Sequence, residues 1–456
     1  MPVRETGAPS APWAVTRPLP HRKAAALAVP AIASNIAVPV AGLVDTAVLG
    51  HFAQAVDIGA VGLGAAVVAT LFWVFSFLRP GTTSLVGRAL GAGDEAGAAR
   101  HLQRAGALAT VLSAVWLALQ WLIVPAILTV LAPAGTVRDT ALDYTLIRGL
   151  SLPALLVTLV VAGYFIGAHN TRVPLVVAAA TAAINMGLDF VFVGGFGWGA
   201  TGAAWGTFGS EWVGAALAVT LLWRRLTHEQ RHAVLDWRDR GLRTGWGALA
   251  RFNSALMART ALLMAVVTFV ASVGSRFDTE TLAANAIMLQ LMHFASYALD
   301  GYANAAEALA SHAAGRVDPG GLNAAAVASA LPMVVIAVAL TATYWLARHG
   351  ILALLTDLPD VSSAALQYWG YIAVFPLLSW GAWWLDGIYL GAGRPGLMLA
   401  SMLASTLLVF LPILVFGTLA TGMLTNDHVW QAFLGLNVAR QVTLVALYPR
   451  LVRTLA

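Results

Sequence analysis

Two aspartates stand alone among apolar residues in the amino-terminal half of the chain. Asp45 is the only charged residue in the run AAALAVPAIASNIAVPVAGLVDTAVLG, and Asp189 is the only one in VPLVVAAATAAINMGLDFVFVGG. Asn185 lies four residues before Asp189 and therefore on the same face of a helix. An ionised carboxylate at the centre of a bilayer costs roughly 2.5–3.5 kcal/mol, so such acids are usually paired, protonated or used to bind a cation. These residues predict a cation-binding or proton-binding site, with pairing to Arg148 or Arg79 as the alternative.

A second polar set lies in the carboxyl-terminal half. Asp300 and Glu307 are seven residues apart and share one face of a helix. An acidic cavity with walls of low dielectric constant concentrates the electric field, so this set is a candidate substrate cleft that attracts cations. The alternative is a group of helix–helix hydrogen bonds or pairing with Arg259. The full set consists of Asp300, Glu307, Asp386, Trp383 and Tyr371.

One string has the form of an enzyme motif. His228, Glu229 and His232 spell HEQRH, the HExxH pattern in which two histidines four residues apart hold zinc and the glutamate activates water. The string lies in an arginine-rich connector, where only Asp236 or Asp239 is nearby as a third ligand. We therefore expect a solvated linker between two domains and keep a metalloenzyme as a remote alternative.

The composition indicates a membrane protein. Hydrophobic residues make up 59% of the 456 residues and charged residues 10%, against roughly 45–50% and 25% in soluble domains. The chain contains no cysteine, so neither a disulfide nor a cysteine-bound metal can carry the function. Nearly all of the positive charge is arginine, which fits loops on the cytosolic side of a membrane better than a nucleic-acid surface. We therefore expect an integral membrane protein without a nucleic-acid partner.

Apolar runs of about 20 residues or more predict twelve transmembrane helices. Residues 1–23 form a polar, proline-rich cytosolic tail, and residues 227–246 form a cytosolic linker between two halves of six helices each. We expect an all-α polytopic membrane protein with an amino-terminal lobe at 24–226 and a carboxyl-terminal lobe at 247–456. The predicted helices span residues 24–50, 59–87, 102–132, 141–168, 173–194, 200–224, 247–273, 282–312, 322–348, 361–391, 395–419 and 428–452.

Arginine is unevenly distributed among the predicted loops. With both termini in the cytosol, the outer loops hold only Arg138, Arg276 and Arg348, and the cytosolic side collects most of the others. Positively charged residues in short loops stay on the cytosolic side during membrane insertion. We therefore predict a multi-pass protein of the bacterial inner membrane with both termini in the cytoplasm.

The two halves look like copies of each other. At a shift of 224 residues, LVGRALGAGD, which ends at Asp94, aligns with LASHAAGRVD, which ends at Asp318. Six helices per half is an even number, so both copies enter the membrane from the same side and are related by a pseudo-two-fold axis along the membrane normal. This arrangement predicts a central cleft between two lobes that opens to either side of the membrane in turn.

Four segments carry a resemblance to a known family: PAIASNIAVPVAGLVDTAVLGH, NMGLDFVFVGGFGWGATGAAWGT, LDGYANAAEAL and LDGIYLGAG. In their order and position they resemble the MATE family of multidrug and toxic compound extrusion transporters. The two LDG elements and Asp45 resemble its DinF-like branch, and the resemblance covers nearly the whole chain after residue 23. It implies two six-helix lobes around a V-shaped cleft and efflux of organic, often cationic, compounds driven by influx of H⁺ or Na⁺.

The resemblance also implies roles for single residues. The cation site of DinF-like members falls on Asp45, Asn185, Asp189 and Thr207, and Pro30 matches a proline at which the first helix can bend. NorM-type relatives carry an acid in helix seven that is not evident in ARFNSALMARTALLMAVVTFVAS. Two carboxylates and two neutral oxygens can ligate Na⁺ or hold one proton between the acids. We favour H⁺ as the coupling ion and leave Na⁺ open.

These observations predict a secondary antiporter rather than an enzyme. It exports amphipathic or cationic small molecules in exchange for H⁺ or Na⁺, needs no other cofactor, and works as a monomer in the lipid bilayer. The closest alternative is a flippase for lipid-linked precursors from the same superfamily, which would need a basic cleft to hold a pyrophosphate. The charges inside the predicted helices are mostly acidic, which favours the antiporter.

Overall fold

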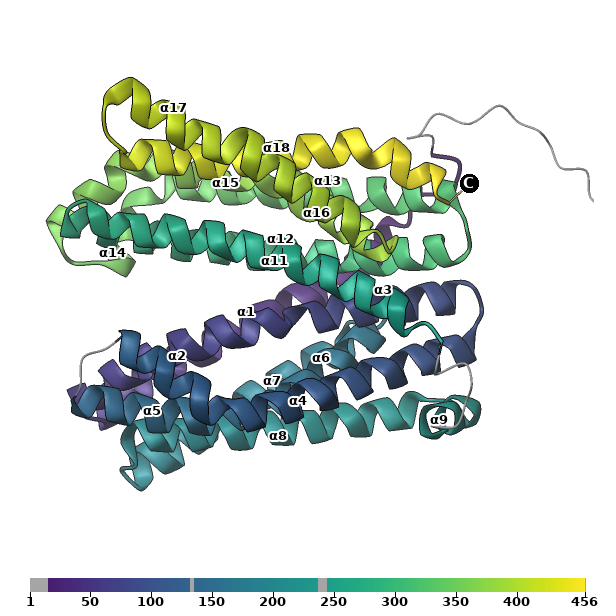
Figure 1. The fold of residues 1–456 in the computed structure, drawn as a ribbon, viewed down its shortest axis with the longest axis horizontal. Helices are drawn as coiled ribbons and strands as arrows, with labels where there is room; N and C mark the ends of the chain where they lie inside the picture. Colours follow the sequence, from purple (N-terminus) through teal and green to yellow (C-terminus); the bar gives the residue numbers. More distant parts are fainter. Residues whose placement is uncertain (1–14, 132–134, 237–243, 456) are drawn as a thin grey trace, which may run out of the picture. The chain divides into compact units, whose positions relative to one another are not determined.

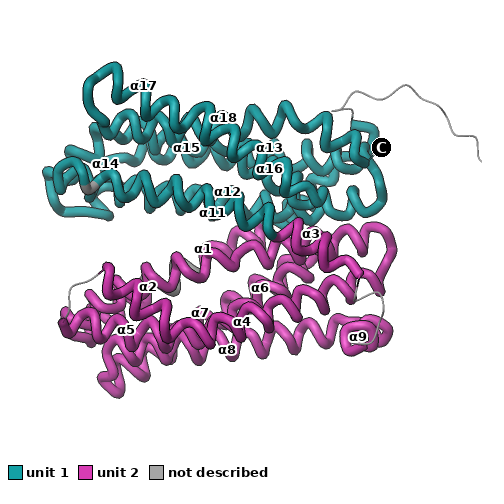
Figure 2. Tube along the Cα trace, in the orientation of Figure 1, with its two compact units in different colours: residues 1–28, 254–456 teal, residues 29–253 magenta. Residues whose placement is uncertain are grey.

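The computed structural model describes residues 15–131, 135–236 and 244–455, which are helices joined by short turns (Figure 1). The chain divides into two compact units, shown in Figure 2. Unit 1 comprises residues 1–28 and 254–456, and unit 2 comprises residues 29–253. Both divisions fall inside helices, one in α1 (His21–Phe52) and one in α11 (Trp246–Val273).

Unit 2 contains most of the first six spans and a short helix after them. α7 packs along α8, α2 along α5, and α3 along α6. After α1, its elements are α2 (Ala55–Trp73), η1 (Val74–Phe77), α3 (Leu78–Gly91), α4 (Glu95–Leu131), α5 (Thr136–Gly149), α6 (Leu152–Gly167), α7 (Arg172–Asp189), η2 (Phe190–Gly195), α8 (Gly199–Arg225) and α9 (His228–Leu235).

Unit 1 contains most of the last six spans. α12 packs along α15, and α15 and α16 both contact α18. After α11, its elements are η3 (Gly274–Arg276), α12 (Thr279–Gly315), α13 (Pro319–Leu346), α14 (Arg348–Leu355), α15 (Pro359–Gly391), α16 (Pro395–Ser405), η4 (Thr406–Phe410), α17 (Leu411–Thr421) and α18 (Asn426–Arg453).

The twelve predicted spans are confirmed as helices. By length and apolar composition alone, eight helical spans in the described chain can cross a membrane, and the pair α5 and α6, bent by 42°, makes a ninth. α1, α8 and α18 contain 32, 27 and 28 residues and are long enough for the other three. The chain is therefore an all-α polytopic membrane protein with six spans in each half.

Several breaks in regular helix geometry were not predicted from the sequence. η1 is a 3₁₀ turn between α2 and α3, whereas η2 and η4 are π-helical segments. η2 follows α7 in the fifth span, and η4 lies between α16 and α17 in the eleventh span, which is the fifth of its half. A π-helical turn widens the helix locally and often marks a functional site.

The internal repeat is visible in the backbone of the turns. Val317 has a φ of 53° after α12, and Gly93 has a φ of 77° at the corresponding position after α3. His169 (φ 59°) after α6 corresponds in the same way to Gly393 (φ 75°) after α15. Both pairs are 224 residues apart, the shift that the sequence predicts. The two halves therefore end their second and fourth spans with the same left-handed turn.

The two aspartates of the repeated motif have the same local role. An oxygen of Asp94 accepts a hydrogen bond from the backbone N–H of Gly97 at 2.7 Å, and Asp318 accepts one from Gly321 at 2.9 Å. Each carboxylate thus caps the amino terminus of the following helix, α4 or α13. The two aspartates that end the repeated sequence motif therefore both serve as helix caps.

An aromatic core holds α12, α15 and α18 of unit 1 together. Phe375 of α15 stacks on Phe433 of α18, with ring centroids 5.8 Å apart. Trp430 of α18 is fully buried and donates a hydrogen bond to Asn285 Oδ1 of α12 at 2.8 Å. Asn285 and Asn426 exchange two further hydrogen bonds, of 2.8 and 3.1 Å. A buried indole N–H and buried amides are thereby satisfied, and the three helices are fixed against one another.

Candidate functional site

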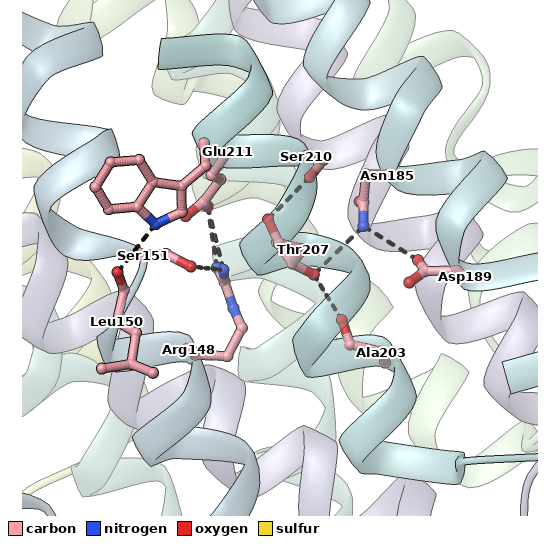
Figure 3. A network of polar contacts seen from close by, with 10 residues as sticks. Arg148, Leu150, Ser151, Asn185, Asp189, Ala203, Thr207, Ser210 and Glu211 are labelled. Atoms are coloured by element: carbon pink, nitrogen blue, oxygen red, sulfur yellow. Dashed lines mark hydrogen bonds and ion pairs between the residues drawn. The ribbon is translucent and has the colours of Figure 1, made fainter. Parts of the chain in front are cut away.

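Asn185, Asp189 and Thr207 form a connected group between α7 and α8 of unit 2 (Figure 3). Asn185 Nδ2 donates to Asp189 Oδ2 and to Thr207 Oγ1, both at 3.3 Å. Thr207 Oγ1 in turn donates to the backbone oxygen of Ala203 at 2.9 Å. Asn185 and Asp189 are only 4% and 1% exposed. Three of the four residues predicted as a cation site are therefore joined by direct hydrogen bonds.

Asp45 brings α1 to this group. Its carboxyl group interacts directly with that of Asp189. Oδ1 of each residue is buried and has no hydrogen-bond donor among the described residues. When both are ionised, the two groups offer only acceptors to each other and repel. A proton or a cation between them removes both problems, and this is the chemistry that the site can perform.

The local backbone places Asp189 for this contact. Asp189 is the last residue of α7, and the π-helical segment η2 begins at the next residue. Asn185 lies one helical turn earlier, so both side chains share a face. The sequence predicts this shared face, whereas the π-helical segment beside it is known only from the structure.

Gly206 is a residue of the site that sequence reasoning missed. It is buried on α8, and a Cβ atom added there would overlap Asp189 Oδ1 and lie 3.5 Å from its Cγ. The absence of a side chain therefore lets the Asp189 carboxyl group lie against α8. In the sequence this glycine is one of several in GATGAAWGTFGS, and nothing there distinguishes it.

A buried ion pair lies beside Thr207 in the network that Figure 3 shows. Arg148 of α5 donates to Glu211 Oε1 and to Ser151 Oγ, both at 3.2 Å. Its guanidinium also acts electrostatically on Asp45 and Asp189. Glu211 lies four residues after Thr207 on α8, and its Oε2 has no partner among the described residues. The site therefore contains three carboxyl groups and one permanent cation.

Tyr144 is a second residue that sequence reasoning missed. It lies one helical turn before Arg148 on α5 and is 7% exposed. It is close to Arg148 and within the electrostatic reach of Asp45 and Glu211. In the sequence Tyr144 is an ordinary tyrosine in DTALDYTLIRG, and nothing there marks it as part of the site. Its position near Asp45 depends on how α1 and α5 pack.

Pro30 lies in the first half of α1. The helix is continuous from His21 to Phe52, so the chain is helical on both sides of this proline. The division between the two units falls between Ala28 and Val29, next to Pro30. A proline inside a helix removes one backbone hydrogen bond and weakens the helix at that point. The hinge assigned to Pro30 remains a prediction, and the position of the division supports it.

The residues of the candidate substrate cleft lie on two helices of unit 1. Asp386 of α15 forms ion pairs with Arg259 and Arg440. For Asp386 the structure therefore shows pairing with Arg259, which the sequence leaves open as the alternative to a substrate cleft. Tyr371 donates from its hydroxyl to Asp427 Oδ1 at 2.7 Å. The remaining members are Trp383, half-buried on α15, Asp300, half-buried on α12, and Glu307, buried on α12.

The HEQRH string forms the short helix α9. Thr227 and Gln230 make reciprocal hydrogen bonds at its start, with Gln230 N donating to Thr227 Oγ1 at 3.2 Å and Thr227 N to Gln230 Oε1 at 3.1 Å. Gln230 also contacts Glu95 of α4. The rings of His228 and His232 lie 4.4 Å apart, and no third histidine or acid completes a metal-binding group in the described part of the chain. His228 and His232 thus lie in a short helix whose start is capped by Thr227 and Gln230. Asp239 lies outside the described residues.

Comparison with known proteins agrees with this architecture. The chain is 32% identical over 424 residues to the DNA damage-inducible protein F of Escherichia coli (strain K12). The matched residues make up 93% of this chain and 91% of that protein. It is 29% identical over 273 residues to a probable multidrug resistance protein NorM of Deinococcus radiodurans, covering 58% of this chain and 57% of the other.

The fold is also that of a solved transporter. A MOP superfamily transporter from Pyrococcus furiosus matches with a TM-score of 0.84 at 17% sequence identity, over 98% of this chain and 99% of that one. The family model MatE matches residues 30–191 and 255–416, one match in each half of the internal repeat. Because the family model covers both halves and the protein F similarity nearly the whole length, the chain belongs to the MatE family of membrane transporters, in its DinF-like branch.

Proposed function

We propose that this transporter exports amphipathic organic compounds, cationic ones among them, in exchange for protons across the bacterial inner membrane. The observation that carries the proposal is the facing pair of carboxyl groups of Asp45 and Asp189, each with a buried oxygen that lacks a donor. The relatives named as multidrug resistance proteins support the substrate class. Both termini lie in the cytoplasm in this proposal, because of the arginine-rich loops.

A proton couples this site to movement of helices. A proton on one carboxyl group donates a hydrogen bond to the other, and this bond holds α1 to α7. When the proton leaves, two negative charges face each other in a medium of low dielectric constant and repel strongly. Loading and release therefore change the attraction between α1 and α7, and this change in packing is what drives the conformational change.

Arg148 favours a proton over Na⁺. Its guanidinium acts on Asp45 and Asp189, and although Glu211 offsets part of its charge, Na⁺ held beside it keeps its full charge and is repelled by it. A proton becomes part of a neutral carboxylic acid and does not suffer this repulsion. Na⁺ ligated by Asp45, Asn185, Asp189 and Thr207 is the alternative that the experiment below separates.

The two units supply the moving bodies. Each is compact and carries one copy of the repeat, so we propose that they act as the two lobes of an alternating-access transporter. Pro30 lies next to the division of the units in α1 and only fifteen residues before Asp45. A hinge at Pro30 can therefore link the state of the coupling site to the position of the lobes.

Transport by the purified protein in proteoliposomes tests the proposal. Efflux of an amphipathic cation such as ethidium is measured with a proton gradient alone, a Na⁺ gradient alone, or neither. Asp45→Asn and Asp189→Asn should each reduce proton-driven efflux to the level of empty liposomes, because a single carboxyl group can no longer form the shared-proton pair. Asp139→Asn is the matched control, since Asp139 is 71% exposed and lies at the start of α5.

Two results would contradict the proposal. Efflux that persists in both Asp45→Asn and Asp189→Asn would show that the carboxyl pair is not the coupling site. Efflux that follows the Na⁺ gradient and not the proton gradient would replace H⁺ by Na⁺ as the coupling ion.

A further inference from the structure

Three charged side chains meet inside unit 1, whereas the residues of the proposed coupling site belong to unit 2. Arg259 of α11 and Arg440 of α18 both contact the same oxygen, Oδ2, of Asp386 on α15, and the contact with Arg440 measures 2.7 Å. The side chains of Arg259, Arg440 and Asp386 are only 13%, 4% and 14% exposed. Three separate helices thus bring two guanidinium groups to one carboxylate.

The charges of this cluster do not cancel. Asp386 attracts Arg440 and Arg259 repels it, and these are the two ionisable groups that act on Arg440 in the described part of the chain. The second group bound by Arg440 is the neutral amide oxygen of Asn437, at 3.2 Å. One positive charge therefore remains in a poorly hydrated site, where an uncompensated charge is unfavourable.

Arg259 has an unused donor. Its Nε atom is buried and has no acceptor among the described residues, while its Nη2 is bound to Asp386. A guanidinium presents its donors in a planar fork that matches the two oxygens of a carboxylate or phosphate. An anionic group that accepts from this fork would satisfy the orphaned N–H and remove the excess charge at once.

An aromatic ring adjoins the cluster. Trp383 lies on α15, one turn before Asp386, and the Cζ atom of Arg440 is 5.9 Å from its ring centre. The ring packs edge to face on Phe375, with centroids 5.7 Å apart, and is half-buried. The half-buried indole lies beside Arg440, which shares Asp386 with Arg259, and so it offers an apolar surface next to the cluster, which is the pairing that an amphipathic anion needs.

We infer that Arg259, with Arg440 behind it, binds the anionic group of an amphipathic ligand, a carboxylate or sulfonate whose apolar body lies against Trp383. Asp386 accepts from both guanidinium groups and offsets part of their charge. Unit 1 thus accepts zwitterionic and anionic compounds in addition to cations. As a statement about transported compounds this rests on the proposed efflux function, whereas the binding itself does not depend on any ion gradient.

Binding to the purified full-length protein tests this inference without transport. The protein is placed in nanodiscs of phosphatidylcholine, and the fluorescence anisotropy of fluorescein is followed in the absence of gradients. The cationic ester of tetramethylrhodamine shares the xanthene ring and serves as the probe of opposite charge. Failure of the efflux function would leave this measurement unaffected, so the two proposals can fail separately.

Substitutions of Arg259 and of Asp386 should change the affinity for fluorescein in opposite directions. Arg259→Gln should weaken fluorescein binding about tenfold, as expected for loss of a charge-assisted hydrogen bond. Arg259→Lys should weaken it less, because it keeps the charge and loses the fork. Asp386→Asn should tighten fluorescein binding, since a carboxylate that competes for the two arginines is gone. Arg394→Gln, at an exposed arginine before α16, should have no effect.

Equal fluorescein affinity in the wild type, Arg259→Gln and Asp386→Asn, with folding checked by size exclusion and thermal unfolding, would overturn the inference. If Asp386→Asn does not fold, the fluorescein affinities of Arg259→Gln, Arg259→Lys and Arg394→Gln still test the inference. Displacement of fluorescein by an equal concentration of inorganic phosphate would show that the cluster recognises a free anion, and the assigned ligand class would then be wrong.

Discussion

At the scale of single residues, the proposed coupling site contains small and neutral groups that contact its acids directly. Asn185 connects Asp189 to Thr207 by hydrogen bonds of 3.3 Å, and Gly206 leaves room for the Asp189 carboxyl group. An amide and a hydroxyl can orient a carboxyl group without adding charge. The reactivity of the acids is thereby set by distance and burial, and two substitutions test this directly.

Gly206→Ala should impair transport by displacing Asp189. The added methyl group would overlap Asp189 Oδ1, so the carboxyl group must move away from α8 and from its contact with Asp45. We expect proton-driven efflux to fall about tenfold, because misplacement of a reactive group by a fraction of an ångström has effects of this order.

Gly187→Ala is the matched control for this prediction. A Cβ atom at Gly187 would have no neighbour within 4 Å, and alanine is the better helix former. Its efflux should equal that of the wild type. Equal activity of Gly206→Ala and Gly187→Ala would show that the close approach of α8 to Asp189 has no role in transport.

Glu211→Gln should shift the pH dependence of transport. Glu211 is the anionic partner of Arg148. Without that charge the guanidinium acts more strongly on Asp45 and Asp189 and favours their ionised form, so loading a proton requires a higher proton concentration. The pH at which efflux is half-maximal should therefore fall.

The double variant Arg148→Gln/Glu211→Gln separates this effect from a loss of packing. Removing both charges eliminates the guanidinium that causes the shift, so the half-maximal pH should return toward or above the wild-type value. The measurement is initial efflux rate against pH in proteoliposomes. A reduced maximal rate with an unchanged pH profile in Glu211→Gln would mean that the ion pair is structural only.

At the scale of elements, equivalent turns of the two halves share a left-handed backbone but differ in residue type. Gly93 and Val317 have the same left-handed backbone, 224 residues apart. Glycine adopts this conformation freely, whereas a β-branched residue with positive φ is strained. At this turn the second half of the chain therefore keeps a strained residue where the first half has the unstrained one, and the reverse holds for His169 and Gly393.

Val317→Gly should stabilise the protein by about 0.5–1 kcal/mol. Relief of left-handed strain is worth roughly 1–2 kcal/mol, and the greater freedom of glycine in the unfolded chain offsets part of this. Val317 is 63% exposed, so little packing is lost. Thermal unfolding of the purified protein measures the change.

The mirror substitution Gly93→Val is the control for this prediction. It places the strained residue in the first half, so it should lower the unfolding temperature while Val317→Gly raises it. If both substitutions shift the unfolding temperature in the same direction, backbone strain is not the dominant effect at these turns.

At the scale of the whole molecule, alternating access requires that the two units move relative to each other during transport. The chain contains no cysteine, so spin labels on introduced cysteines report only the chosen positions. Arg172 and Gly396 are equivalent in the repeat and exposed at predicted cytosolic turns, and Thr136 and Asp360 are equivalent and exposed at the predicted outer side. Each pair joins one residue of unit 2 to one of unit 1.

Label distances should respond to pH with opposite signs on the two faces. Protonation of the coupling site should lengthen the distance in one pair and shorten it in the other, because rocking that opens one side closes the other. Double electron–electron resonance in nanodiscs measures both distances. Asp45→Asn is the control, and its distances should not respond to pH. Constant distances in both pairs of the otherwise unaltered protein would exclude rocking of the units and leave a local gate.

The sequence by itself determined the class of protein and the twelve helices, and it predicted the residues of the proposed coupling site. Apolar runs of this length have few alternatives in a bilayer, because every backbone polar group must be satisfied within the helix. Asp45 and Asp189 were recognisable for the same reason, since each is the only charge in its run. Asn185 followed from helical spacing, and Thr207 from the family resemblance.

Only the tertiary structure decided which charges meet. Arg148 pairs with Glu211, and Arg440 joins Arg259 at Asp386, although these residues lie on helices far apart in the sequence. Hydropathy and spacing describe one helix at a time, whereas the partner of a buried charge depends on which faces of different helices pack together. The place of Gly206 was hidden in the sequence for the same reason, because only the structure shows that the Asp189 carboxyl group lies against it.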